Sequence, residues 1–156
     1  MRYQLMWLLA PLLLCIWPTA VLAQQPLTTD QVHYFVSFFE RIGSADVSLE
    51  LLDHNEVAVR SFYNLTDDEA RTLHTAAQSY RATMTALRQK ELAIVAGKSQ
   101  LSDSDRSAVG ALVISRDQAV KGVATAFLSA IRPATAAQIL ADAEETVKTR
   151  IANGVR

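Results

Sequence analysis

The chain has 156 residues and a formal net charge of −1, from 15 Lys and Arg against 16 Asp and Glu. This near balance excludes both the strongly basic surface of a nucleic-acid-binding protein and the acidic composition of a disordered tail. Half of the residues are hydrophobic, and the length corresponds to a domain that is large enough to bury a core.

The first 23 residues have the pattern of a secretory signal peptide. Arg2 supplies a positive start, residues 5–17 (LMWLLAPLLLCIW) form an apolar core, and a small residue, Ala23, precedes the expected cleavage point. The alternative is an uncleaved membrane anchor. We prefer the signal peptide, because the apolar core is shorter than the roughly 20 residues that a spanning helix needs.

Cleavage after Ala23 would leave residues 24–156 as a single domain with a net charge of 14 − 16 = −2, since the signal removes one arginine and no acidic residue. The only cysteine, Cys15, would leave with the signal, so the domain must be held by packing without disulfides. We therefore expect a periplasmic or secreted protein with no stable membrane span after cleavage and no nucleic-acid partner.

The rest of the chain has a helical pattern, with abundant alanine and little proline. Apolar residues recur at steps of three and four, which predicts amphipathic helices packed along a bundle seam. A short helix is expected near Glu56–Tyr63, although VSLEL at residues 47–51 alternates like a strand. The predicted fold is all-α: an antiparallel bundle of four main helices plus the short helix. The main helices are predicted over 29–42, 67–96, 103–131 and 136–152.

A capping pattern precedes each main helix. A Ser or Thr side chain accepts a hydrogen bond from the amide three residues on, and the acidic or amide side chain there bonds back to the cap. Each such cap stabilises a helix by about 1 kcal/mol, which is sufficient reason for the pattern to recur. The predicted pairs are Thr28 with Gln31, Thr66 with Glu69, Ser102 with Asp105 and Thr135 with Gln138.

Two of these caps also carry a family resemblance. LTTDQ at residues 27–31 matches the LTxxQ pentapeptide of the Spy/CpxP-like periplasmic proteins, and LTDDE at residues 65–69 resembles it with Glu for Gln. The resemblance implies a small exported helical protein that acts as an ATP-independent chaperone or envelope-stress regulator, often as a cradle-shaped dimer. The chain is also similar to exported bacterial helical proteins of unassigned function, which implies no activity. Helix capping accounts for all four occurrences of the pattern.

The helix predicted over 29–42 is unusually apolar. Its apolar side chains cover an arc of roughly 200°, against about 100° for an ordinary core-facing helix. The extra width indicates either an exposed surface for a partner or a flank that packs beneath segment 44–63. The candidate partner surface consists of Tyr34, Phe35, Phe38 and Phe39.

Two charged residues interrupt the apolar faces of the second and third main helices. Glu91 and Arg116 each fall at the centre of such a face, where an unpaired buried charge would cost several kcal/mol. They form a candidate buried polar pair, but a turn near residues 99–101 offsets them by roughly 10 Å. Glu40 is an alternative partner for Arg116. A structural ion pair, or solvation of the charges, is preferred to a ligand site.

No catalytic motif is present: the sequence lacks a nucleophile elbow, a glycine-rich phosphate loop and an HExxH pair. No two of His33, His54 and His74 have the i, i+4 spacing of a helical metal site. A site of His54 with Asp53 and Glu56 is conceivable, but the two acids also suit a helix cap. We therefore predict no enzyme activity, no metal and no cofactor.

The sequence as a whole predicts an exported non-enzymatic helical protein that binds other polypeptides in a chaperone-like or envelope-stress role. The expected partner is a second copy in a homodimer, or an unfolded or other protein. The alternatives are a small-ligand or metal-responsive periplasmic sensor with a polar site at Glu91 and Arg116, and a structural envelope protein.

Overall fold

A computed structural model describes residues 26–43 and 49–153, and every regular element in these ranges is an α-helix. The all-α prediction is confirmed, whereas the signal peptide predicted over residues 1–23 lies outside the described residues. None of the described helices is both long enough and apolar enough to cross a membrane. The helices are α1 (Thr29–Gly43), α2 (Leu49–Phe62), α3 (Asp67–Val95), α4 (Asp103–Ala130) and α5 (Pro133–Ala152).

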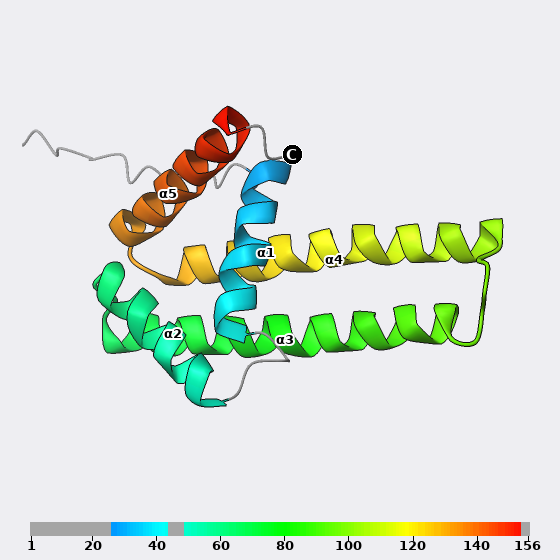
Figure 1. Cartoon of the computed structure of the whole chain (residues 1–156). Helices are drawn as coiled ribbons and strands as arrows, with labels where there is room; N and C mark the ends of the chain where they lie inside the picture. The colour runs from blue at the N-terminus through cyan, green and yellow to red at the C-terminus, as the bar shows by residue number, and fades with distance from the viewer. Residues whose placement is uncertain (1–25, 44–48, 154–156) are drawn as a thin grey trace, which may run out of the picture.

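The two longest helices, α3 and α4, form an antiparallel hairpin (Figure 1). Helix α1 runs across both of them at one end, where α2 and α5 also pack, and the remainder of the hairpin projects away from this assembly (Figure 1). We call the covered end the base and residues 81–119 the arm. The structure thus contains the predicted helices. It does not describe four main helices packed side by side along a common length, as the predicted bundle would have.

Three of the predicted caps start their helices. The Thr28 amide donates to Gln31 Oε1 at 2.9 Å, and the Gln31 amide donates to Thr28 Oγ1 at 3.2 Å. The same reciprocal pair of bonds joins Thr66 to Glu69 at the start of α3. Ser102 and Asp105 repeat it at the start of α4. These boxes satisfy amides at the helix start that have no partner within the helix.

The fourth predicted cap is wrong. Helix α5 begins at Pro133, so Thr135 lies inside the helix, where it is buried. Proline suits the first helical position because its fixed φ is already helical and its missing N–H is not needed there. The Ala136 amide completes the first turn by donating to the Arg132 carbonyl at 2.9 Å.

Helix α2 is longer than predicted. It begins at Leu49 rather than near Glu56, so the last three residues of the VSLEL segment are helical and not part of a strand. It is joined to α3 by polar contacts, among them an ion pair of Arg60 with Asp67.

The core lies in the base and is built around aromatic rings. The Phe39 ring stacks on Tyr80 of α3 with centroids 5.6 Å apart, and meets Phe127 of α4 edge-on at 6.3 Å. Such aromatic pairs add about 0.5–1.5 kcal/mol beyond the burial of their area. The largest fully buried side chains are Phe35, Phe39, Ile42, Leu73, Val120, Phe127 and Ile139.

Candidate functional site

The predicted aromatic surface on α1 is part of the core. Phe35 and Phe39 are fully buried and Phe38 is 8 % exposed, so the prediction of an exposed surface made from these rings is wrong. The wide apolar arc of α1 arises because this helix contacts α2, α3, α4 and α5 on different sides. A helix surrounded in this way buries more than one face.

The alternative placement of the flank, beneath the segment that precedes α3, is supported. The Tyr34 hydroxyl lies 3.2 Å from the Tyr63 hydroxyl, within hydrogen-bonding distance across α1 and the end of α2. Burial raises the pKa of both phenols above its usual value, and it raises that of Tyr63 more strongly. Tyr34 is only partly buried, so of the four predicted surface residues it alone retains appreciable exposure.

The arm, in contrast, has no core of its own. The last buried residue of α3 is Tyr80 and the first of α4 is Val120, and no residue from 81 to 119 is buried. Two helices packed together can cover only the seam between them, and none of the other described helices, α1, α2 and α5, lies over this stretch (Figure 1). Apolar side chains that a bundle would enclose therefore reach the surface, including Leu92, which is 56 % exposed, and Val113, which is 45 % exposed.

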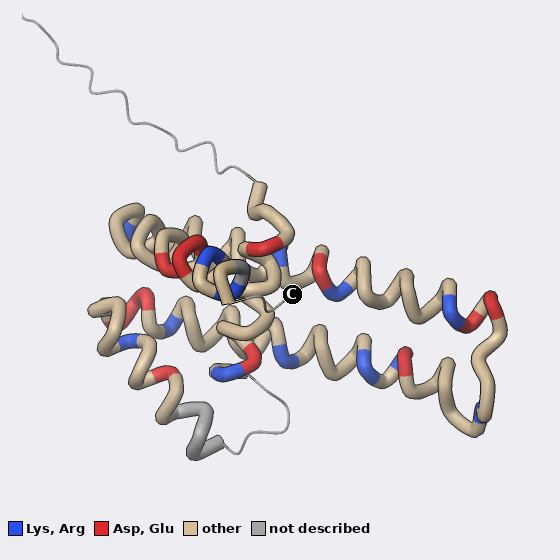
Figure 2. Tube along the Cα trace, turned by 45° about the horizontal axis from the view of Figure 1, so that its top comes forward, with Lys and Arg blue, Asp and Glu red and all other residues tan. Residues whose placement is uncertain are grey.

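These side chains line an open groove of about 590 Å³ that runs from the end of α1 along the arm between α3 and α4. Its apolar lining consists of Met84, Leu87, Leu92, Val109, Leu112 and Val113. Its charged lining consists of Glu40, Arg81, Arg88, Glu91 and Arg116. Charges of both signs are spread along the arm rather than gathered by sign (Figure 2).

The structure places Glu91 and Arg116 in this one groove but pairs Arg116 with another residue. Both Nε and Nη2 of Arg116 lie 3.3 Å from Oδ1 of its neighbour Asp117. The Arg116 side chain is partly solvated, which removes the need for a buried counterion that its sequence position suggested. Glu91 and Arg116 therefore line the same open groove, but they do not form the predicted buried ion pair.

Glu40, the alternative partner, lies at the α1 end of the same groove. Burial raises the pKa of Tyr80 to about 12; the negative charge of Glu40 adds to the rise and the positive charge of Arg116 opposes it. Glu40, Tyr80 and Arg116 thus share one electrostatic environment where the arm leaves the base.

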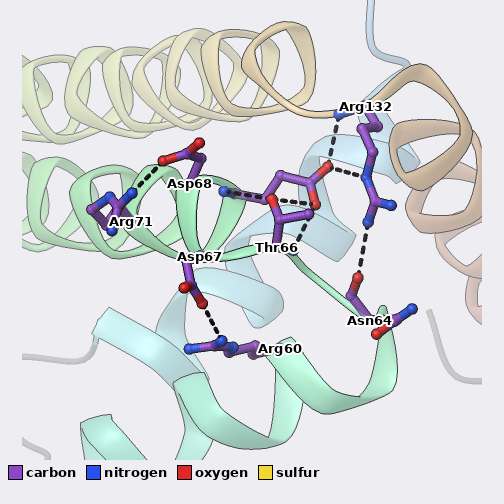
Figure 3. Close-up of polar contacts among 8 residues, drawn as sticks. Arg60, Asn64, Thr66, Asp67, Asp68, Arg71 and Arg132 are labelled. Atoms are coloured by element: carbon purple, nitrogen blue, oxygen red, sulfur yellow. Dashed lines mark hydrogen bonds and ion pairs between the residues drawn. The ribbon is translucent and has the colours of Figure 1, made fainter.

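Glu69 is a buried polar residue of the base, 4 % exposed, that accepts several hydrogen bonds. Figure 3 shows the polar contacts around the start of α3, with Thr66, Asn64 and Arg132 labelled. One carboxylate oxygen completes the Thr66 cap, and the other accepts from the Arg132 amide at 2.8 Å and from Arg132 Nε at 2.9 Å. Arg132 also donates to the Asn64 carbonyl at 2.8 Å. The hydrogen bonds from Arg132 hold the pKa of Glu69 at about 2. This cluster fastens the start of α3 to the link between α4 and α5.

Sequence reasoning identified Glu69 only as a capping residue and did not identify Arg132. The two residues are 63 positions apart, so no local spacing connects them. The one available signal was an arginine directly before the Pro133 that opens a helix. We assign this cluster to stability because all its partners are within the fold.

A histidine joins two of the described helices. His74 Nδ1 lies 2.9 Å from both carboxylate oxygens of Glu56, which joins α3 to α2. Within residues 26–43 and 49–153 there is no group of three or more His, Cys, Asp or Glu side chains placed to hold a metal ion.

No family model, curated protein or solved structure matches this chain. The similarity to Spy/CpxP-like proteins consists of two pentapeptides, and both of them form capping boxes in the structure. The groove on the arm is consequently the feature of the described residues that bears most directly on function.

Proposed function

We propose that this protein is an exported, non-enzymatic protein that binds other polypeptides, and that the arm groove is its binding surface. The observation that carries the proposal is the absence of any buried residue from 81 to 119, in a hairpin whose facing sides are nevertheless apolar. Contiguous exposed apolar surface on a soluble protein marks interaction sites more often than chance.

The form of the groove suits a polypeptide. It is an open groove lined along α3 from Tyr80 to Leu92 and along α4 from Val109 to Arg116, and its lining combines apolar and charged side chains. An amphipathic helix or an extended unfolded segment docks in such a groove by its apolar side chains, while the border charges select orientation. The predicted signal peptide and the LTxxQ resemblance support an envelope role of the chaperone or stress-response type.

The test is suppression of aggregation. The protein recovered after export is mixed at near-stoichiometric amounts with a chemically unfolded client, and light scattering is followed over time. We expect clear suppression by the wild type and the loss of most of it in the double variant Leu92→Ser/Val113→Ser. Both side chains line the groove and are already largely exposed, so their replacement should leave helicity unchanged.

A matched control removes the same amount of exposed apolar surface elsewhere. Val57 lies on α2, and Ile114 lies on the arm outside the groove lining; both are exposed. Val57→Ser/Ile114→Ser should therefore suppress aggregation as the wild type does. Absence of suppression by folded wild-type protein would overturn the proposal. If both double variants lost suppression equally, client binding would not depend on the groove.

A small-ligand sensor is the second candidate, because Glu91 and three arginines line the same groove. Its ligand would be a small anion or a molecule with an acidic group, held by Arg81, Arg88 or Arg116. A thermal-shift series with inorganic anions and divalent metals tests it: a saturable rise in melting temperature that Arg116→Met removes would favour this candidate.

A further inference from the structure

We propose that a cleft between α1, α2 and α5 binds a small zwitterion, an α-amino acid with an aromatic side chain, whose carboxylate pairs with Arg41 and whose ammonium group pairs with Asp142. The cleft has a volume of about 550 Å³, which is within the range of small-molecule sites. It shares no lining residue with the arm groove, so the inference is independent of the proposed function.

The packing of α1 creates the cleft. Helix α1 contacts both α2 and α5, but α2 and α5, as far as the structure describes them, do not pack against each other. The side of α1 that lies between them is therefore left as an open floor. This floor consists of Tyr34, Ser37, Phe38 and Arg41, which follow one another at steps of three and four, the spacing of one helix face.

The α2 wall of the cleft is apolar and ends in two aromatic rings. Phe62 meets Tyr63 edge-on, with ring centroids 4.8 Å apart, and both residues line the cleft. Tyr63 is buried, whereas Phe62 remains 68 % exposed and is not part of the core. An exposed ring beside a cleft offers a contact surface for a planar apolar side chain of a ligand.

The α5 wall is charged. Asp142, Glu145 and Thr146 share one face of α5, and Arg150 follows one turn later. Together with Arg41, the cleft is thus lined by two acidic and two basic residues. A ligand that carries both charges can pair with both kinds of residue, whereas a ligand of one sign also faces like charges, which disfavour its binding.

Arg41 and Asp142 act on the same point of the cleft, the Tyr34 hydroxyl. Burial is the main cause of the raised pKa of Tyr34; the negative charge of Asp142 adds to the rise, and the positive charge of Arg41 opposes it. The hydroxyls of Tyr34 and Tyr63 are 3.2 Å apart at this point. The ammonium and carboxylate groups of an α-amino acid are attached to one carbon, so one ligand placed here reaches both charges.

The carboxylate of Asp142 is incompletely satisfied. Its Oδ2 atom is buried and accepts no hydrogen bond from the described residues. A buried oxygen without a donor is unfavourable, and such a group in a folded protein needs an explanation. The carboxylate can turn about its Cβ–Cγ bond at little cost and so present an oxygen to the cleft. An ammonium group, which has three donors, would satisfy it.

The binding test uses L-tryptophan as the probe, with tryptamine, which lacks the carboxylate, and indole-3-propionate, which lacks the ammonium group. Exported protein is titrated into each probe, and the anisotropy of indole emission is followed. The protein adds no indole signal, because Trp7 and Trp17 both lie in the predicted signal peptide. We expect L-tryptophan to bind saturably with a dissociation constant below about 1 mM. Each analogue should bind at least about tenfold more weakly, because it lacks one of the two charge-assisted contacts.

Two variants assign the two charges. Arg41→Met should lower the affinity for L-tryptophan to that of tryptamine and leave tryptamine binding unchanged. Asp142→Asn should lower the affinity for L-tryptophan to that of indole-3-propionate and leave indole-3-propionate binding unchanged. This crossed pattern is expected only if each residue pairs with a different charged group of the ligand, because a loss of structure would weaken the binding of all three probes together.

Matched controls remove the same kinds of charge outside the cleft. Asp68 and Arg71 form a surface ion pair and do not line the cleft, so Asp68→Asn and Arg71→Met should bind all three probes as the wild type does. Phe62→Ser changes an exposed ring and should weaken all three probes by a similar factor. Circular dichroism confirms that each variant is folded. If Asp142→Asn does not fold, Arg41→Met decides the outcome, since Arg41 is exposed.

The contrary outcomes come from the same titrations. Wild-type protein that binds none of the probes, or that binds either analogue as tightly as L-tryptophan, would overturn the proposal. Arg41→Met and Asp142→Asn variants that keep the wild-type affinity for L-tryptophan would overturn it as well. None of these outcomes bears on the arm groove, whose client binding is measured separately with Leu92→Ser/Val113→Ser.

Discussion

The base and the arm are built on the same two helices, α3 and α4, but only the base has buried residues. Along α3, apolar residues recur at steps of three and four in both regions, yet Leu73, Ala77 and Tyr80 are buried whereas Met84 and Leu87 are only half-buried. The difference is α1, which crosses the hairpin at the base and stops short of the arm (Figure 1). Periodicity determines which face of a helix is apolar, and tertiary packing determines whether that face is covered.

Aromatic content follows the same division. All five phenylalanines lie outside residues 81–119, and four of them, Phe35, Phe38, Phe39 and Phe127, form the buried aromatic cluster of the base. Large rings supply most of the apolar area that can be removed from water in a small core. The arm is lined by Met, Leu and Val, which suit an adaptable contact surface better than a rigid core.

The largest effect should come from breaking the base. Phe39→Ala removes a fully buried ring that contacts α1, α3 and α4, and should lower the free energy of unfolding by about 3–5 kcal/mol. Leu87→Ala, at a half-buried position of the arm, should cost clearly less. Urea unfolding of the two variants measures both values. Equal losses would mean that the arm contributes to the core as much as the base does.

An intermediate effect is expected at the Glu69 cluster. Glu69→Gln removes a charge that accepts bonds from the Arg132 amide and side chain, and should cost about 1–3 kcal/mol at neutral pH. The pKa of Glu69 is lowered from 4.5 to about 2. The charged carboxylate therefore contributes its full stabilisation above about pH 4.5, and this stabilisation is lost as the pH falls toward 2. Wild-type stability should therefore fall more steeply over this range than that of the variant.

Asp68→Asn provides the control for that acid dependence. Asp68 is a neighbouring carboxylate of the same helix turn, but it is exposed and forms an ion pair with Arg71 on the surface. Its replacement should change stability little, and the acid dependence should remain that of the wild type. If Glu69→Gln also retained the wild-type acid dependence, the cluster would not be a source of stability.

The smallest effect should come from the arm surface. Leu92→Ser/Val113→Ser alters two exposed side chains and should change the free energy of unfolding by no more than about 0.5 kcal/mol per site, measured by urea unfolding at a concentration where the protein is monomeric. The same variant is expected to lose client suppression. A large loss of stability would show that these residues serve the fold and would remove the contrast between the two regions.

Much of the fold was predictable because its signals are local. The caps at Thr28, Thr66 and Ser102 depend on side chains and amides three residues apart, and each starts the predicted helix. The cap at Thr135 was wrong for an equally local reason, since Pro133 provides an earlier start. The long helices α3 and α4 were predicted to within one residue at each end because their apolar periodicity is sustained.

The candidate site was harder to predict. From the sequence, the wide apolar arc of α1 indicated either a partner surface made of its aromatics or a flank packed beneath segment 44–63, because an arc of that width exceeds what one neighbour can cover. It could not show that α1 has four helical neighbours, which use the whole arc. It did identify Glu91 and Arg116 as charges on apolar faces, and these two residues now mark the groove.

The sequence by itself determined the class of the fold, the starts of α1, α3 and α4 and the apolar face of each long helix, because these depend on interactions within about one helical turn. Only the tertiary structure decided which apolar residues are covered. The contacts that decide it are long-range: Phe39 on Phe127, and Glu69 with Arg132, join parts of the chain 88 and 63 residues apart (127 − 39 and 132 − 69). The position of α1 across the hairpin turns one half of a continuous apolar seam into a core and leaves the other half as a surface.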